Sequence, residues 1–204
     1  MQDQIYDCTV IGGGAGGLSA GIYFQKFLLN SLILEKGKGR SVWIQNLTNY
    51  LGTAPETPAH KILKQGKEHY LSLNGNYLNG FAEEVFDEGE YFRIKVKTNK
   101  KQAEYREIKS KYLIAASGII DLLPEMDNMR NVYDYAGYNL HVCMVCDGYE
   151  MKDKICGLFV NSDERIETAL ALKWFTSKII VFTNNSFAIS LERQAKLEKH
   201  NFKL

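Results

Sequence analysis

The stretch CTVIGGGAGGLSAGIYFQKFLLNSLILE, residues 8–35, decides the fold of the chain. Its apolar and β-branched beginning, residues 8–11, predicts a buried parallel strand. A glycine-rich turn and a helical pattern over residues 18–27 follow, and a second buried strand over residues 31–34 ends at Glu35. Strand, turn, helix and strand form one βαβ unit, whose crossover is expected to be right-handed.

The turn inside this unit carries the glycine spacing of a dinucleotide-binding fingerprint. Gly12, Gly14 and Gly17 supply a tight turn, close approach of the backbone to a pyrophosphate, and tight packing of helix against strand. The N–H groups that open the helix attract a diphosphate, and Glu35 stands 18 residues after Gly17 at a strand end. A carboxylate there accepts hydrogen bonds from ribose hydroxyls and repels a 2'-phosphate, which favours FAD or NAD over NADP. The alternative is an ordinary glycine-rich turn.

The rest of the first half predicts a loop, a helix and further strands. Residues 37–58 contain glycines, two prolines and polar side chains and are expected to be irregular. Beyond this loop, alternation of apolar and polar residues predicts an antiparallel meander with one solvated face. The expected elements are a helix over 59–71, antiparallel strands over 91–97 and 105–108, and a buried strand over 112–116 that ends in Ser117 and Gly118.

The second half repeats the same plan. Residues 121–139 form a connector, and we place the domain boundary after residue 119, which gives domains 1–119 and 120–204. The expected fold class is α/β, with two Rossmann-like three-layer βαβ domains. The elements expected in the second domain are a strand, a helix and a strand, over residues 155–160, 163–175 and 178–182.

Composition and charge narrow the function classes. With 204 residues, 45% of them apolar, the chain can bury a hydrophobic core. Its 25 Lys and Arg residues balance 24 Asp and Glu residues, so the net charge of +1 gives no general attraction to nucleic acid or to an anionic membrane. The N-terminal residues lack a basic signal-peptide region, and glycines interrupt the first apolar stretch, so no membrane span is expected. We expect a soluble, cytoplasmic protein.

The four cysteines are of two kinds. Cys8 and Cys156 lie in apolar, strand-like runs. Two such cysteines and one C-x-x-C pair do not form the pattern of a secreted disulfide scaffold. Cys143 and Cys146 form that pair, which closes a small disulfide loop and lowers the pKa of one thiol, as thiol–disulfide exchange requires. The alternatives are half of a zinc site or two buried thiols. A zinc site needs two further ligands at a compatible spacing, which the neighbouring sequence does not offer, so no metal is expected.

Four segments together resemble the low-molecular-weight thioredoxin reductase family, in that family's order along the chain. They are the fingerprint Ile11–Gly17, the stretch Thr48–Gly52, the strand end Ala115–Gly118 and the redox motif Cys143–Gly148. The resemblance implies FAD at the fingerprint, an FAD-binding domain with an inserted nucleotide-binding-like domain that carries the C-x-x-C pair, and a homodimer. Family members return to the FAD domain through a later segment, so this chain is expected to lack the C-terminal segment of the FAD-binding domain and to hold only part of the inserted domain.

The same resemblance assigns candidate site residues. The redox pair faces the flavin: Cys146 lies against it, Cys143 attacks the disulfide of a partner, and Asp147 donates the proton. Either Gln45 or Asn49 lies near the isoalloxazine ring. The candidate cofactor-binding residues are Gly12, Gly14, Ala15, Gly17, Glu35, Lys36, Gln45, Asn49, Ala116 and Gly118.

The second βαβ unit lacks the features that bind a nicotinamide cofactor in this family. No glycine follows the strand over 155–160, and the three carboxylates of Asp163, Glu164 and Glu167 stand where a pyrophosphate would rest. No arginine pair follows the strand over 178–182 to hold a 2'-phosphate. The carboxylates also suit the first turn of a helix, because they complement its dipole. An electron donor other than NAD(P)H, such as ferredoxin, is therefore expected.

Three functions are consistent with these features. The first is a thioredoxin reductase-like enzyme that exchanges two electrons between FAD, the Cys143/Cys146 disulfide and a thioredoxin-like partner. The second is an oxygen-dependent oxidase of a small-molecule or protein dithiol, which the sequence Gly148–Glu150 resembles, although Asp147 stands where such oxidases tend to place a histidine base. The third is a flavin-binding interaction module without catalysis, against which the intact cysteine pair argues.

Overall fold

The computed structural model describes residues 4–37, 39–54, 56–98, 104–123 and 132–204. The chain divides into two compact units, Met1–Asp121 and Leu122–Leu204. Asp121, the last residue of the first unit, forms an ion pair of 2.7 Å with Arg40 of the same unit. Residues 124–131, which belong to the expected connector, lie outside the described residues.

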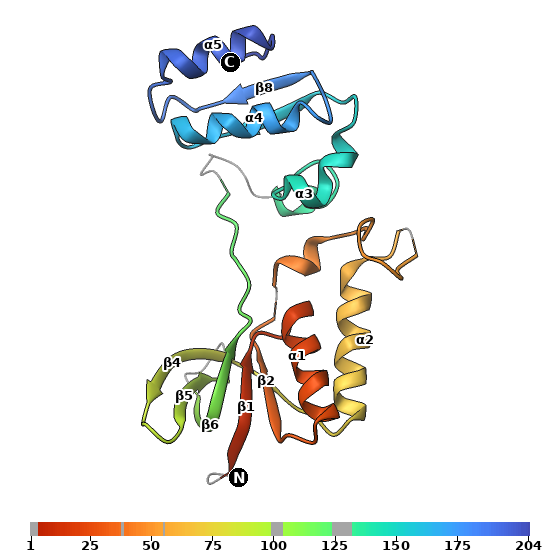
Figure 1. Cartoon of the computed structure of the whole chain (residues 1–204), viewed down its shortest axis with the longest axis vertical. Coiled ribbons are helices and arrows are strands. Elements are labelled where there is room, and N and C mark those ends of the chain that lie inside the picture. Colours follow the sequence, from red (N-terminus) through yellow and green to blue (C-terminus); the bar gives the residue numbers. More distant parts are fainter. Residues whose placement is uncertain (1–3, 38, 55, 99–103, 124–131) are drawn as a thin grey trace. The chain divides into compact units, whose positions relative to one another are not determined.

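A mixed sheet with two helices on one face builds the first unit (Figure 1). Its elements are β1 (Ile5–Ile11), α1 (Ala15–Lys26), β2 (Ser31–Glu35), the 3-10 helix η1 (Arg40–Trp43), α2 (Ala59–Ser72), β3 (Asn76–Asn79), β4 (Phe81–Asp87), β5 (Phe92–Lys97) and β6 (Tyr105–Ala115). The strand order is β3-β2-β1-β6-β5-β4. The first four strands of this order are parallel, and β5 and β4 extend the sheet as an antiparallel hairpin.

The predicted βαβ unit is present, with shifts at its ends. β1 and β2 pair in parallel, and their residues Val10 and Ile33 are fully buried, as expected for strands covered on both faces. α1 begins at Ala15, whereas the sequence predicts a later start at Leu18, because the glycine run itself forms the first turn of the helix. The N–H of Leu18 accordingly donates to the carbonyl oxygen of Gly14 at 2.9 Å.

β6 is one strand of 11 residues, where the sequence predicts two separate strands. Its first half pairs antiparallel with β5 and its second half pairs parallel with β1, so β6 joins the hairpin to the parallel strands. The polar residues 109–111 interrupt the apolar pattern, which is why the sequence predicts a break. In the structure their side chains alternate: Ser110 is buried, and Lys111 forms an ion pair of 2.9 Å with Asp7.

The sequence analysis misses β3 and β4, for local reasons. β3 has 4 residues and is bounded by Asn76 and Asn79, and asparagine is depleted in strands. β4 carries the adjacent acids Glu83 and Glu84, and its register with β5 shifts between Ala82 and Glu84. This irregularity breaks the alternation on which strand prediction depends.

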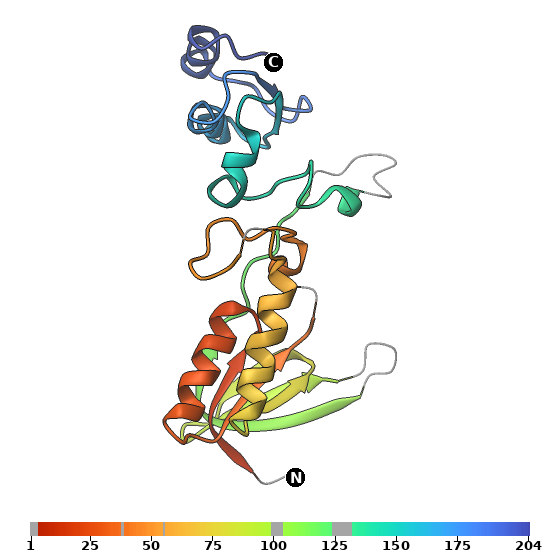
Figure 2. The same cartoon turned by 90° about the vertical axis from the view of Figure 1, so that its right-hand side faces the viewer.

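Buried clusters on the two faces of the sheet give the first unit three layers. One cluster packs the helices against the parallel strands and includes Leu18 and Tyr70. The other lies between the parallel strands and the antiparallel hairpin and includes Leu34 and Ile94. In the turned view, α1 and α2 lie side by side in front of the sheet (Figure 2).

The second unit contains a smaller βαβ arrangement. β7 and β8 pair in parallel, and α4 and α5 share with them one buried cluster that includes Ile166, Val181 and Leu197. The predicted α/β class is thereby confirmed, with two strands in the described sheet of this unit. Its described elements are η2 (Val132–Tyr135), α3 (Met144–Asp147), η3 (Gly148–Met151), β7 (Cys156–Phe159), η4 (Asp163–Ile166), α4 (Glu167–Leu172), β8 (Ile179–Phe182) and α5 (Leu191–Lys199).

Two details of the second unit differ from the prediction. The single helix expected over residues 163–175 is a 3-10 turn followed by α4, which ends at Leu172. α5 is not predicted from the sequence, because six of its nine residues are charged or amide side chains and its two leucines are six positions apart. Within the ranges that the structure describes, none of the helices has the length and apolar character needed to cross a membrane.

Replacing Tyr70 with Phe tests the polar link between α2 and the parallel strands. The Tyr70 hydroxyl is fully buried, donates to the carbonyl oxygen of Ser31 at 2.9 Å and lies 3.0 Å from the Ser31 hydroxyl. Tyr70→Phe removes both contacts, and Ser31 keeps its hydrogen bonds from Asn76 and Gln25, so the free energy of unfolding should fall by about 1 kcal/mol. Urea denaturation, followed by the fluorescence of Trp43 in a Trp174→Phe background, measures the change in this unit.

The matched control is Tyr23→Phe, which removes a hydroxyl from a side chain that is 67% exposed. This control should change the free energy of unfolding by less than about 0.5 kcal/mol. Equal effects of the two substitutions would contradict the role given to the Tyr70 hydroxyl.

Candidate functional site

A cleft of about 550 Å³ lies in the first unit, at the carboxyl ends of β1 and β2. It is lined by the glycine turn after β1, the loop after β2, the middle of α2, the beginning of β4 and the segment that follows β6. Open α/β sheets bind their ligands at this edge, because loops and helix N-termini converge there.

Two of the fingerprint glycines serve close packing of the backbone. Gly12 has a φ of +115°, and a Cβ atom on it would lie 2.2 Å from the carbonyl oxygen of Ala116, so the end of β6 can approach the turn only if this residue is glycine. A Cβ atom on Gly17 would lie 1.8 Å from the carbonyl oxygen of Gly12, so α1 also packs directly on the turn. Neither position leaves room for a side chain.

Gly14 differs from the other two, because it borders open space. A Cβ atom on Gly14 would meet no protein atom within 4 Å, and the residue lines the cleft. Gly14 is also the N-cap of α1, and no side chain caps this helix end. The first N–H groups of α1 therefore lack the side-chain acceptor that usually satisfies them, and an anion bound in the cleft would satisfy them.

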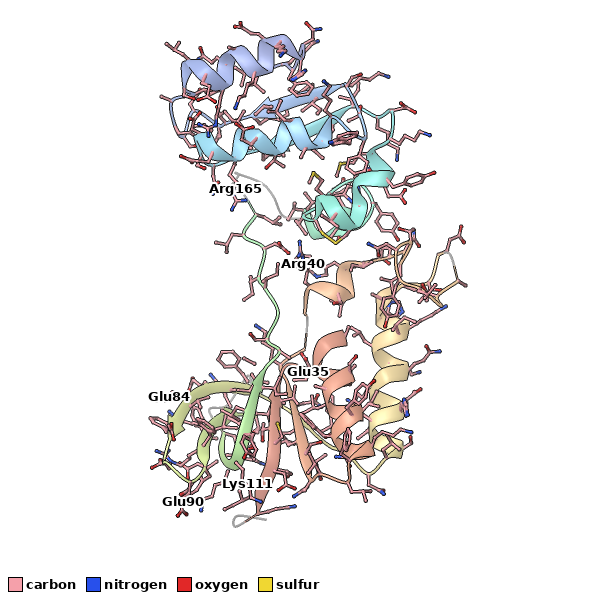
Figure 3. The ribbon with its side chains drawn as sticks, viewed as in Figure 1. Glu35, Arg40, Glu84, Glu90, Lys111 and Arg165 are labelled. Carbon is pink, nitrogen blue, oxygen red and sulfur yellow. A yellow bond between two sulfur atoms is a disulfide. The ribbon has the colours of Figure 1, made fainter. Side chains whose placement is uncertain are left out.

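Glu35 is fixed in position at the end of β2 (Figure 3). Its carboxylate accepts hydrogen bonds from the N–H of Gly13 and, at 2.5 Å, from the N–H of Gly37. Burial and the charge of Glu35 raise the pKa of the neighbouring Tyr77 to about 12, so the Tyr77 hydroxyl stays protonated and available as a donor. Both side chains line the cleft.

The charge of the cleft is positive. Glu35 is the one acidic residue among the described residues that line it, against four basic residues, of which Arg40 is paired with Asp121 and Lys64 lies 3.9 Å from Glu68. The Nζ atom of Lys67 lies 3.8 Å from the centre of the Tyr77 ring, close enough for a cation–π contact. This excess of positive charge favours an anionic ligand such as a dinucleotide. The four basic residues are Lys36, Arg40, Lys64 and Lys67.

The redox motif lies in the second unit and forms a disulfide. The sulfur atoms of Cys143 and Cys146 are bonded at 2.03 Å, with their Cα atoms 5.3 Å apart. Cys143 is the N-cap of α3, and its Sγ atom accepts a hydrogen bond from the N–H of Cys146 at 3.2 Å. The other two cysteines, Cys8 and Cys156, are free, and burial raises the pKa of both thiols. Among the described cysteines, the C-x-x-C pair is therefore the one poised for exchange.

Asp147, the residue after the redox pair, has a partner that the sequence analysis does not predict. Its Oδ2 atom lies 3.3 Å from Nδ1 of His141, and Nε2 of the same ring lies 3.0 Å from the carbonyl oxygen of Tyr138. The interaction with Asp147 is the largest cause that raises the pKa of His141 above its ordinary value, while burial of the ring opposes this rise. The residues are six positions apart and share no regular helix, so no periodicity signals the contact.

Residues 6–168 match the family model described as pyridine nucleotide-disulphide oxidoreductase. The chain belongs to this family. Membership confirms the resemblance to thioredoxin reductases and implies a flavin cofactor for the protein.

Individual thioredoxin reductases match this family member over most of its length. The enzyme of Ureaplasma parvum is 25% identical over 186 residues, which are 90% of this chain and 57% of the relative. The enzyme of Bacillus subtilis is 27% identical over 186 residues, which are 88% of this chain and 54% of the relative. A crystal structure of a putative thioredoxin reductase from Bacillus anthracis shares the fold, with a TM-score of 0.83 over 97% of this chain and 63% of that chain at 18% identity. The chain thus spans a little over half the length of these curated relatives.

The structure brings most of the predicted cofactor-binding residues of this oxidoreductase together. Gln45 and Asn49 are not among the residues that line the cleft, and Asn49 is exposed on the loop that carries both. Ala15 is exposed at the first position of α1, and Gly17 is buried beneath the turn. Of the predicted cofactor-binding residues, those that line the cleft are Gly12, Gly14, Glu35, Lys36, Ala116 and Gly118.

Several residues that line the cleft are not predicted from the sequence, although the spacing of two lysines indicates their position. Lys64 and Lys67 stand three positions apart on α2 and thus on one face of an amphipathic helix, which is the spacing of a basic stripe. Tyr77 belongs to the unpredicted β3, and Arg40 belongs to the irregular loop. No local pattern marks these two positions.

The turn after β7 uses its carboxylates for contacts within the second unit. Asp163 accepts hydrogen bonds from the N–H of Ser190 at 3.0 Å and from Arg193 at 2.6 Å, and Lys196 lies 2.8 Å from the carboxylate of Glu167. The backbone hydrogen bond from Ser190 is the largest cause that lowers the pKa of Asp163. Two of the three carboxylates expected to serve the dipole of their own helix are therefore bound to α5.

Gly12→Ala tests the close approach on which the cleft depends. The added methyl group would collide with the Ala116 carbonyl and force an alanine into the left-handed region, so the free energy of unfolding should fall by about 2–3 kcal/mol. The matched control is Gly16→Ala, since a Cβ atom on Gly16 meets nothing within 4 Å. Chemical denaturation of the two variants makes the comparison, and equal stabilities would contradict the packing described.

Proposed function

We propose that the chain is the major part of an FAD-dependent disulfide oxidoreductase that exchanges two electrons between FAD, the Cys143/Cys146 disulfide and a thioredoxin-like protein. One observation carries the proposal: a formed C-x-x-C disulfide occurs in the same chain as a positively charged dinucleotide cleft over an open glycine turn. A small disulfide or dithiol is the alternative substrate to a protein partner. By the thioredoxin reductase resemblance, the working protein is a homodimer.

The residues of the cleft fit the groups that FAD would bring. The open side of Gly14 and the uncapped N-terminus of α1 suit the pyrophosphate. Lys36 and Lys67 supply positive charge, and Glu35 is already oriented to accept hydrogen bonds from ribose hydroxyls. When bound, FAD supplies a carrier for an electron pair.

The roles in the second unit follow from the chemistry of disulfide exchange. A disulfide that receives two electrons gives two thiolates, and one proton converts one of them to a thiol. Cys146 would form the sulfur contact with the flavin, Cys143 would attack the disulfide of the partner, and Asp147 would deliver the proton. The N–H of Cys146, which donates to Sγ of Cys143 at 3.2 Å, supports this role, because a hydrogen bond to the sulfur stabilises a thiolate.

The electron donor in this proposal is not NAD(P)H, and a small iron–sulfur protein such as ferredoxin is the candidate. A pyrophosphate needs free N–H groups and a nearby glycine at the turn after β7. That turn carries Asp163, Glu164 and Glu167 instead, and Asp163 and Glu167 are tied to α5. Because Asp163 and Glu167 are paired with cations of α5, the features that oppose a dinucleotide there are the lack of a glycine and the charge of Glu164.

A dithiol oxidase is the second candidate, and one contact favours it. Oxidation of a dithiol releases protons, and His141 and Asp147, 3.3 Å apart, form a pair that can accept one of them when the ring is neutral. In this direction, the substrate dithiol would reduce the Cys143/Cys146 disulfide and oxygen would receive the electrons.

Gly14→Ala tests the placement of the cofactor. The substitution adds a methyl group where the cleft is open, so it should change the free energy of unfolding by less than about 1 kcal/mol and should lower the affinity for FAD about tenfold or more. Isothermal titration with FAD measures the affinity. Gly16→Ala, which adds a methyl group outside the lining of the cleft, should leave it unchanged. Wild-type affinity in Gly14→Ala would argue against a pyrophosphate at this turn.

Anaerobic reduction of the purified flavoprotein tests the donor and the redox pair. Reduced ferredoxin should bleach the flavin absorbance, whereas NADPH and NADH should not, because the turn after β7 repels them. Cys146→Ser should abolish reduction of thioredoxin disulfide, and Cys156→Ser, which alters a free and half-buried thiol, should not. Rapid bleaching by NADPH would refute the donor assignment. Oxygen uptake on addition of dithiols, without turnover from ferredoxin, would favour the oxidase.

A further inference from the structure

The His141 ring is held between two acceptors beside the redox motif. Its Nε2 atom lies 3.0 Å from the carbonyl oxygen of Tyr138, and its Nδ1 atom lies 3.3 Å from Oδ2 of Asp147. The side chains of His141 and Asp147 are 13% and 24% exposed, and the Nδ1 atom is out of contact with solvent and has no hydrogen-bond partner of normal geometry. Nε2 therefore has a hydrogen-bond partner in Tyr138, and the nearest charge to the buried Nδ1 atom is the carboxylate of Asp147.

The two neighbours determine which protonation state of His141 is satisfied. A carbonyl oxygen only accepts hydrogen bonds, so Nε2 must carry a hydrogen to bond with Tyr138. In the neutral ring, Nδ1 would then be bare, and its lone pair would face the oxygen of Asp147 without a donor. The imidazolium carries a hydrogen on both nitrogens, so Nε2 still donates to the Tyr138 carbonyl oxygen and the positive ring faces the Asp147 carboxylate.

The charges around the ring act in the same direction. The contact with Asp147 is the main cause that raises the pKa of His141, and the Asp147 charge, the Tyr138 carbonyl and the more distant carboxylate of Glu150 add to it, against the effect of burial. These groups come from α3, from η3 and from the segment before the redox motif. The ring is thus disposed to hold a proton near neutral pH.

We propose that His141 is a positioning residue that stores, in an ion pair with Asp147, the proton that the Cys143/Cys146 couple takes up on reduction and releases on oxidation. The proposal rests on the proposed function for its electron source. An ordinary aspartic acid, with a pKa of about 4, carries a proton in only about one molecule in a thousand at pH 7. A proton donor that acts at neutral pH therefore needs a reservoir, and the imidazolium is one.

Two electrons enter the Cys143–Cys146 bond, the sulfur–sulfur bond breaks, and one proton passes from the His141–Asp147 pair to one of the two thiolates. The products are one thiol, one thiolate and a neutral imidazole beside the carboxylate, and solvent water restores the proton. Oxidation of the couple runs the same step in reverse, so the pair serves a reductase or an oxidase equally.

The test is the pH dependence of disulfide reduction in the full chain. Dithiothreitol supplies the electron pair without FAD, and its rate of reaction with the Cys143–Cys146 bond is divided by the concentration of its thiolate at each pH. Wild-type protein should show a fall in this corrected rate as pH rises through the pKa of the imidazolium. His141→Gln keeps a hydrogen-bonding side chain but does not titrate, so it should lose this fall and react roughly tenfold more slowly near pH 7.

A control and a second measurement complete the test. His200→Gln alters a histidine of the same unit whose pKa is lowered by burial and by nearby lysines, and it should leave the profile unchanged. An NMR titration of the imidazole resonances should place the pKa of His141 above 6.5 in wild type and lower in Asp147→Asn. This titration applies even if His141→Gln does not fold.

Two results would overturn the proposal: the same corrected pH profile in wild type and His141→Gln, or a pKa of His141 at or below 6.5. Failure of the proposed function gives a different result. A protein that retains no FAD but keeps the profile that depends on His141 would refute the flavoenzyme and leave the proton reservoir in place.

Discussion

The first unit depends on the close approach between the glycine turn and the end of β6. The carbonyl oxygen of Ala116 occupies the space where any side chain of residue 12 would begin, at 2.2 Å from the position of its Cβ atom. The same turn receives α1 at Gly17, so strand, helix and the end of β6 converge on a few backbone atoms. Dense packing on one side of the turn leaves Gly14 open on the other, and the cleft forms there.

The cleft orients its acidic side chain without a ligand. The N–H groups of Gly13 and Gly37 donate hydrogen bonds to the carboxylate of Glu35 and fix its orientation. A fixed acceptor loses little conformational entropy on binding, which favours affinity and specificity together. Basic side chains from α2 and from the loop after β2 surround this single acid, so a ligand must present both anionic phosphates and neutral hydroxyl groups to match the whole surface.

The parts of this site that the sequence predicts are those set by local geometry. Gly12, Gly14 and Glu35 follow from a strand, a turn and a helix in immediate succession, whose spacing is nearly fixed by the backbone. Tyr77 reaches the cleft only because β3 pairs with β2, and that pairing depends on contacts between distant segments. The contact of His141 with Asp147 is missed for the same reason: it depends on how the chain winds through the redox motif, which no periodic pattern records. Residue spacing thus predicts a backbone site well and a side-chain pair poorly.

The acidic side chains of the second unit have two kinds of partner. Some are paired with lysine or arginine, and Asp147 is paired with a histidine. Asp163 and Glu167 face Arg193 and Lys196, cations that stay charged throughout the physiological range. Such pairs fix α5 against the turn after β7 and exchange no protons. Asp147 faces an imidazole, the one side chain whose ordinary pKa lies close to neutrality. Asp147 directly follows Cys146, and its N–H donates to the carbonyl oxygen of Cys143 at 3.0 Å, so the acid whose partner titrates near neutrality belongs to the same turn as the bond whose reduction consumes a proton.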